Sequence, residues 1–242
     1  MLTARVPIGT CSFNCGYGPT NLTEFTQSWG AMLVYSYEFV CRARKGEILH
    51  LAYGRTSDVA DSRNYLARTM MGEFILMLDV DHCFEPDLLA RMLALFNSPS
   101  PDGDRVDVLS GFYRYRSYPY LPCAFHWDEA AQQHAVIGQL SWNAPMVKVG
   151  CTGAGCLLIR RSVFDRIRDE LHEEPFTRIP PIGEDFAFGR RIAKLGIKWW
   201  LSPQIKCDHL TTKRISDADY DPSVVELVPA PSGGVAIGEV RK

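Results

Sequence analysis

Apolar residues follow two patterns along the first half of the chain, and each pattern predicts one kind of secondary-structure element. A spacing of three and four residues predicts helices, and Pro86 suits the first turn of one of them. Short continuous apolar runs predict strands. The predicted helices cover residues 24–44, 58–71 and a segment that begins at 86, and the predicted strands cover 5–10, 47–52, 73–78 and 106–112. Strands that alternate with helices are typical of an α/β protein.

The second half of the chain is less regular, and residues 113–122, rich in Tyr, Arg and Pro, predict no regular element. The remaining predicted strands lie near residues 135–140, 146–149, 155–160 and 197–201, and the remaining predicted helices cover 162–171 and 184–195. We therefore expect one domain over residues 1–210, with a mixed central sheet flanked by helices. Residues 211–242 are expected to form an extended or partly disordered tail.

The apolar run Phe74–Leu78 ends abruptly at Asp79-Val80-Asp81. A run without alternation predicts a strand that is buried on both faces. Residues two apart on a strand share a face, so we expect Asp79 and Asp81 side by side at its carboxyl end, where open α/β sheets bind ligands. Two carboxylates there suit Mg²⁺ or Mn²⁺, and solvated acids at a strand end are the alternative.

Two later segments carry further candidate chemistry. Glu184 and Asp185 begin a predicted helix, where the helix dipole alone explains acidic residues, and where a carboxylate could also accept a proton from a hydroxyl. His209 follows the last predicted strand. Its imidazole has either a structural role or completes a metal site begun by Asp79 and Asp81, since Mn²⁺ accepts mixed oxygen and nitrogen ligands.

Composition narrows the class of protein. The chain of 242 residues is 46% hydrophobic and 22% charged, as in ordinary globular proteins. Its net charge of −2 provides no global field for nucleic acid or an anionic membrane. The sequence has no signal-peptide pattern and no apolar run long enough to span a membrane, and its eight cysteines show no zinc-binding spacing. We expect a cytoplasmic protein with free thiols.

Glycine motifs exclude two nucleotide-binding loops. The Gly-x-Gly at Gly153–Gly155 precedes a predicted strand instead of following one, so it does not fit a dinucleotide-binding fingerprint. No phosphate-binding loop of the G-x-x-x-x-G-K-[ST] type is present either.

The order of these motifs resembles the GT-A glycosyltransferases, which have a Rossmann-like nucleotide-diphospho-sugar transferase fold. The similarity is greatest to the compact, soluble, family 2-like enzymes of bacteria and phages. It covers about residues 5 to 210 and rests on six motifs. These are Ser62-Arg63-Asn64, Leu76–Asp81 with its D-x-D, Phe84–Leu89, Gly150–Arg161, Gly183-Glu184-Asp185 and His209.

The resemblance implies a metal site and a base. Asp81 would bind an Mn²⁺ or Mg²⁺ ion that bridges the diphosphate of a UDP- or GDP-sugar. Asp79 would contact the same metal or the ribose, and His209 would be the third protein ligand. Asp185, or less readily Glu184, would be the catalytic base of an inverting enzyme.

The resemblance also implies a nucleotide pocket. Arg63 would face the base or phosphates, and the loop around Pro7 and Thr10 would line the base pocket. The turn at Gly153 and Gly155 would let the backbone approach the sugar or acceptor, as glycine permits.

The prediction is a metal-dependent glycosyltransferase that moves a sugar to a hydroxyl of a glycan, a small molecule or modified DNA. For DNA, the segment Tyr113–Tyr120, with Arg114 and Arg116, is the expected contact. One alternative is a sugar-nucleotide nucleotidyltransferase, although residues 9–16 lack the basic residues of its loop. Another is a non-catalytic carbohydrate-binding module. The Trp199-Trp200 pair is predicted to be core and not a sugar-stacking platform.

Overall fold

A computed structural model describes residues 8–13, 22–41, 49–53, 58–128, 133–211, 214–220, 223, 225–229 and 235–240. Its helices are α1 (Leu22–Ser36), a π-helical turn (Tyr37–Cys41), α2 (Val59–Thr69), α3 (Leu88–Phe96), α4 (Arg161–Leu171), α5 (Glu184–Lys194) and a 3₁₀ turn (Asp217–Asp219). Its first strands are β1 (Ile8–Phe13), β2 (Leu49–Tyr53), β3 (Phe74–Asp79), β4 (His82–Phe84), β5 (Val108–Phe112), β6 (Ala124–Asp128) and β7 (Gln133–Val136). The later strands are β8 (Val147–Val149), β9 (Cys151–Thr152), β10 (Cys156–Arg160), β11 (Trp199–Leu210), β12 (Arg214–Ile215), β13 (Val225–Pro229) and β14 (Val235–Val240).

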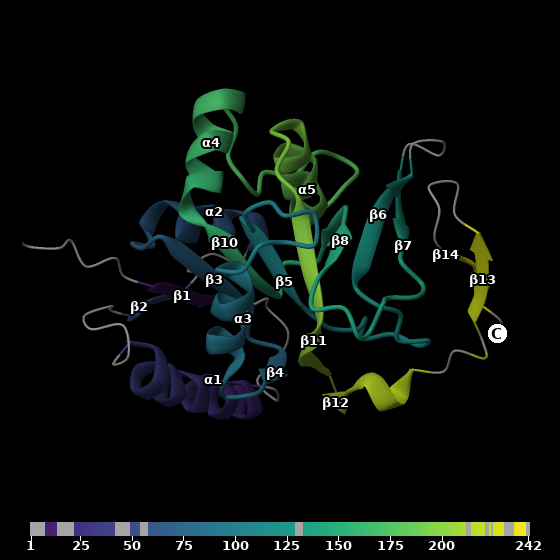
Figure 1. The fold of residues 1–242 in the computed structure, drawn as a ribbon, viewed down its shortest axis with the longest axis horizontal. Coiled ribbons are helices and arrows are strands. Elements are labelled where there is room, and N and C mark those ends of the chain that lie inside the picture. Colours follow the sequence, from purple (N-terminus) through teal and green to yellow (C-terminus); the bar gives the residue numbers. More distant parts are fainter. Residues whose placement is uncertain are drawn as a thin grey trace, which may run out of the picture.

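The main sheet has the strand order β12-β11-β5-β10-β3-β1-β2, with β4 and β8 also paired to β11. Strand β3 lies in its interior, parallel to β1 and antiparallel to β10. The sheet is therefore mixed, which confirms the predicted α/β fold. A smaller sheet, β7-β6-β9, lies beside it and packs toward α5 (Figure 1).

Helices cover both faces of the main sheet, with α2, α4 and α5 on one side and α1 and α3 on the other (Figure 1). Successive side chains of β3 point to opposite faces, as in any strand. Ile75 and Met77 join the core under α2 and α4, whereas Leu76 and Leu78 join the core under α1 and α3. The absence of alternation in this run is thus explained, and the prediction of a strand buried on both faces is confirmed.

Strand β11 is much longer than the predicted strand at residues 197–201. Its first part pairs with β5, and its last part pairs with β4, with an irregularity between Ser202 and Lys206. Beyond Pro203 only Ile205, Cys207 and Leu210 are buried, so the apolar run that marked the strand stops although the strand continues. His209 therefore lies within β11, and its predicted place beyond the last strand is wrong. Trp199 and Trp200 are buried, which confirms that they are core.

The described part of residues 211–242 is mostly extended. Strand β12 continues the main sheet at its edge, and β13 and β14 form an antiparallel hairpin that lies next to β7 (Figure 1). The domain boundary at residue 210 stays a prediction. In the described residues, no helix combines the length and the apolar character that a membrane span needs.

Candidate active site

The turn after β3 separates the two carboxylates of the D-x-D sequence. Strand β3 ends at Asp79, and Asp81 lies in the turn that leads to β4. The argument that residues two apart share a strand face therefore does not apply to this pair. Asp79 and Asp81 enter two different networks.

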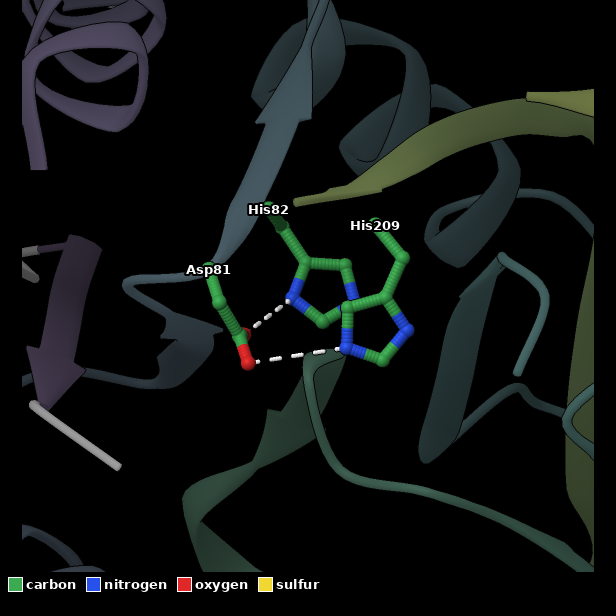
Figure 2. A group of neighbouring side chains, drawn as sticks. All are labelled: Asp81, His82 and His209. Atoms are coloured by element: carbon green, nitrogen blue, oxygen red, sulfur yellow. Dashed lines mark hydrogen bonds and ion pairs between the residues drawn. The ribbon is translucent and has the colours of Figure 1, made fainter. Parts of the chain in front are cut away.

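Asp81 belongs to a group with His82 and His209, which we call the donor group (Figure 2). Each residue offers one ligand atom, and these atoms all lie within 4.8 Å of one another. The antiparallel pairing of β4 with β11 places His82 directly opposite His209, and their rings stack at a centroid distance of 4.5 Å. The turn then brings Asp81 to the edge of both rings.

Hydrogen bonds fix the tautomers of both histidines. The Nδ1 of His209 lies 2.8 Å from the carbonyl oxygen of Arg114, which can only accept, so Nδ1 carries the proton and Nε2 a lone pair. The Nδ1 of His82 donates to Asp81 Oδ1 at 3.0 Å. The Nε2 of His82 is buried and has no hydrogen-bond partner among the described residues. In its neutral form each imidazole of the donor group thus has its lone pair on Nε2, beside the Asp81 carboxylate.

The protonation states suit a metal site. Burial would raise the pKa of Asp81, but the interactions of Asp81 with His209 and His82 outweigh burial and hold that pKa well below its usual range. Burial lowers the pKa of His209. An ionised carboxylate and neutral imidazoles are the forms that bind metals, and this mixed oxygen and nitrogen set suits Mn²⁺. A metal therefore fits the residues present.

Asp79 belongs instead to an ion cluster with Arg63 and Glu184, which we call the arginine cluster. Arg63 lies on α2 and is only 3% exposed. Its Nη2 lies 3.2 Å from each carboxylate oxygen of Asp79. Its Nη1 bonds Glu184 Oε1. Burial would lower the pKa of Arg63, but the carboxylates of Asp79, Glu184 and Asp185 raise it.

Glu184 and Asp185 both lie in the first turn of α5, as predicted, but their partners differ. Glu184 bonds Arg63 and lies 3.9 Å from Arg178. Asp185 forms no ion pair with any described residue, and its Oδ1 accepts the backbone N–H of Phe186 at 2.8 Å. Burial raises the pKa of Asp185 to about 6 although Arg63 opposes it. Asp185 is therefore the stronger candidate base.

Aromatic packing holds the first turn of α5 against the smaller sheet. The ring of Phe186 lies 4.6 Å from that of Phe125 on β6 and 4.7 Å from that of His134 on β7. Because Phe186 follows Asp185 directly, this packing fixes where the Asp185 carboxyl can lie.

One cavity of about 470 Å³ connects the two networks, a volume in the range of small-molecule sites. Its wall includes residues from the donor group, the arginine cluster and the first turn of α5. They are Arg63, Asp79, His82, Tyr113, Arg116, Gly153, Glu184, Asp185 and His209, among others.

Gly153 and Gly155 make room for side chains. A Cβ at Gly155 would lie 2.5 Å from Cε1 of His82, and one at Gly153 would overlap the Tyr113 hydroxyl. That hydroxyl accepts the backbone N–H of Gly155 at 3.1 Å. The glycines are thus needed to seat His82 and Tyr113, and their contact with a sugar or acceptor stays a prediction.

The roles of the two predicted base-pocket residues stay predictions. Pro7 lies outside the described residues, and Thr10 lies inside β1, where it pairs in register with Leu51 and Leu76. The sequence prediction also missed His82 as part of the site. Its position directly after Asp81 is the signal that could have found it.

The segment Tyr113–Tyr120 turns its arginines inward. Arg114 is 5% exposed, and its guanidinium lies 4.2 Å from the ring centroid of Tyr220. Arg116 places Nη2 2.5 Å from Asp81 Oδ2 and donates from Nε to His209 Nε2 at 2.9 Å. Both arginines have partners within the protein, and a nucleic-acid contact by this segment stays a prediction.

Comparisons with known proteins agree with this geometry. The chain matches the profile of Glycosyl transferase family 2 over residues 41–168, more than half of its length. It is similar to the crystal structure of A197 from STIV, with a TM-score of 0.52 and 15% identity over 97% of both chains. It is also similar to GalNAc-T7 crystallised with UDP, GalNAc and Mn²⁺, with a TM-score of 0.55 and 12% identity over 86% of this chain and 45% of that one. A search of curated protein sequences finds no match.

The fold is that of the GT-A glycosyltransferases. The chain belongs to Glycosyl transferase family 2.

Proposed function

We propose that the protein is a metal-dependent enzyme that transfers a sugar from a nucleoside-diphosphate sugar, UDP- or GDP-linked, to a hydroxyl of an acceptor. The observation that carries this proposal is the donor group, whose His82 and His209 line one cavity with Asp185 and the arginine cluster. The structural neighbour GalNAc-T7 was crystallised with UDP and Mn²⁺, which agrees with the proposed chemistry.

Asp81, His82 and His209 would hold the metal. Two imidazoles beside one carboxylate favour Mn²⁺ over Mg²⁺, which prefers oxygen ligands and keeps its waters. When bound, the metal supplies a Lewis acid that neutralises the diphosphate leaving group. His209 is oriented for this task by the carbonyl of Arg114, and His82 by Asp81.

Asp185 would act as the base. The O–H bond of the acceptor breaks, its proton passes to the Asp185 carboxylate, and its oxygen bonds the anomeric carbon while the bond to the diphosphate breaks. A pKa raised to about 6 by burial leaves Asp185 ionised at neutral pH and a stronger base than an exposed aspartate. Glu184, bonded to Arg63 and near Arg178, would position the helix start.

Asp79 and Arg63 would shape the nucleotide side of the cavity. Both carboxylate oxygens of Asp79 accept hydrogen bonds from Arg63. We therefore assign Asp79 to the wall of the cavity and to contact with a ribose hydroxyl, and not to the metal. Arg63 keeps its charge at any physiological pH, so the two carboxylates beside it stay compensated when a substrate excludes water.

A thermal-shift panel tests the proposal. The protein is titrated with UDP, GDP and nucleoside triphosphates, each with Mn²⁺, with Mg²⁺ and with EDTA, and Asp81→Asn is the matched control. We expect a nucleoside diphosphate to stabilise the protein only with metal, and not to stabilise the variant. A response to triphosphates alone would favour a nucleotidyltransferase. No response to any nucleotide would leave only a binding module.

A further inference from the structure

Arg116 contacts two of the atoms that would bind the metal. Its Nη2 lies 2.5 Å from Asp81 Oδ2, and its Nε donates to His209 Nε2 at 2.9 Å. These are one carboxylate oxygen and the lone pair of one imidazole, two of the three ligands that the donor group offers. The guanidinium therefore lies where a cation would be bound.

Arg116 and a metal ion cannot bind these atoms together. A divalent ion of this kind sits about 2.0–2.2 Å from its ligands, and a hydrogen-bonded N–H would already occupy that space. Both groups are positive, so the repulsion between them adds to the steric conflict. Loading of the metal must turn Arg116 away.

The backbone that carries Arg116 is held in place, so its side chain is the part that can move. On either side of it, the N–H of Tyr115 donates to Leu121 O at 2.9 Å, and the N–H of Tyr120 donates to Ser117 O at 2.8 Å. The Arg114 carbonyl must also stay on His209 to keep its tautomer. By contrast, the Arg116 side chain is 34% exposed and already lines the cavity.

We propose that Arg116 is an exchangeable counter-ion of Asp81, which the metal displaces and which then turns into the cavity to bind the diphosphate of the donor. This inference rests on the proposed function. Without metal, one positive arginine balances one carboxylate. With metal, the same region gains two further positive charges and releases a guanidinium, whose planar fork fits phosphate oxygens.

Metal and nucleotide binding are then coupled through one side chain. A diphosphate that captures Arg116 removes the competitor of the metal, and the metal releases the arginine that the diphosphate needs. By linkage, each ligand raises the affinity of the protein for the other by the same factor.

The test measures binding and not turnover. Mn²⁺ binding without nucleotide is followed from the EPR signal of free Mn²⁺, and UDP binding at saturating Mn²⁺ by calorimetry. The proteins are the wild type, Arg116→Gln, Arg116→Lys and the control Arg166→Gln. Arg166 is also a partly exposed arginine, 42% accessible and paired with Glu170, but on α4 and away from the cavity.

We expect Arg116→Gln to bind Mn²⁺ about tenfold more tightly than the wild type, because a competing cation is lost. The same variant should bind UDP with Mn²⁺ about tenfold more weakly, because a charge-assisted hydrogen bond is lost. Arg116→Lys keeps the charge and should stay near the wild type for Mn²⁺, and Arg166→Gln should change neither constant. General damage to the site would weaken both ligands, so opposite changes are specific to the exchange.

Two results would overturn the inference, and they differ. If the wild type binds Mn²⁺ and UDP but Arg116→Gln binds Mn²⁺ no more tightly, the exchange is wrong and the proposed function stands. If neither protein binds Mn²⁺, the proposed function fails and the exchange fails with it.

Discussion

Asp79 and Asp81 are two residues apart in the chain, yet they are held in opposite ways. Asp79, in the arginine cluster, is matched by the permanent charge of a buried arginine. Asp81, in the donor group, lies beside two imidazoles and Arg116, whose side chain is about one-third exposed. In the first network both carboxylate oxygens of Asp79 face the guanidinium of Arg63. The second gathers three potential metal-ligand atoms within 4.8 Å of one another, an arrangement that a cation can complete.

The turn after β3 gives the two aspartates different partners. Because β3 ends at Asp79, the following turn points Asp81 at β4 and β11 instead of along the strand. The backbone N–H of Asp79 is held by the carbonyl of Gly155 at 2.9 Å, so the same glycine borders both networks. Variants on either side should therefore give different defects.

The largest difference is expected between Asp81→Asn and Asp79→Asn. Loss of the Asp81 charge removes the only carboxylate of the donor group, so we expect kcat/KM to fall by about 10⁴-fold. Mn²⁺ binding should be lost as well. Asp79→Asn should leave Mn²⁺ binding nearly unchanged, because Asp79 contacts Arg63 and not the donor group. If EPR shows an equal loss of Mn²⁺ affinity in both variants, the assignment of Asp81 and not Asp79 to the metal is wrong.

The next effect concerns Asp185. We expect Asp185→Asn to lower kcat about 10²- to 10³-fold while Mn²⁺ and UDP affinities stay near those of the wild type. In the wild type, kcat/KM should rise with pH, be half-maximal near the pKa of about 6 and level off above it, because only the ionised carboxyl accepts a proton. A flat pH profile with normal kcat in the variant would exclude Asp185 as the base.

Much of the fold could be predicted because burial leaves a pattern in the sequence. Strand β3 is apolar at each of Phe74–Leu78 since both faces are covered, and α5 has its acids in the first turn. The second half of β11 could not be found, because only three of its seven residues beyond Pro203 are buried. The pairing of His82 with His209 depends on that part of β11 and on three-residue β4. A register between segments so far apart has no local signal.

The candidate site, like the fold, could be predicted only in part. Asp81, Asp185 and His209 lie at or beside one cavity because the ends of β3, β11 and α5 meet there. Whether two nearby acids share a partner depends on side chains from other elements. Arg63 comes from α2 and Arg116 from the segment after β5, so the split between Asp79 and Asp81 was not visible.

A stability effect should mark the arginine cluster. Arg63→Gln leaves Asp79 and Glu184 without their buried cation, so we expect a loss of about 3 to 5 kcal/mol in the free energy of unfolding. The control is Arg105→Gln, whose 65% exposed side chain pairs with Asp107 and should cost about 0 to 1 kcal/mol. Urea unfolding measures both. Equal small losses would show that the cluster is solvated in solution.

Asp185 also predicts a pH-dependent stability. Burial raises its pKa from 3.8 to about 6, so the folded state holds the proton more tightly than the unfolded state. The resulting stability is present below the ordinary pKa and is lost as the pH rises through about 6. At about pH 8, Asp185→Asn should therefore be more stable than the wild type by up to about 3 kcal/mol, with a smaller gap at about pH 5. Urea unfolding at the two pH values checks this, and a gap independent of pH would contradict it.

The smallest expected effect comes from one methyl group beside the donor group. A Cβ at Gly155 would lie 2.5 Å from the His82 ring, so Gly155→Ala should push that ring away from Asp81. We expect Mn²⁺ affinity to fall about 10- to 100-fold, as when other groups that orient metal ligands are disturbed. Gly30→Ala is the control, because a Cβ there meets nothing within 4 Å, and within α1 it should stabilise the protein by about 0.5 to 1 kcal/mol. Wild-type Mn²⁺ affinity in Gly155→Ala would mean that His82 supports the fold and not the metal.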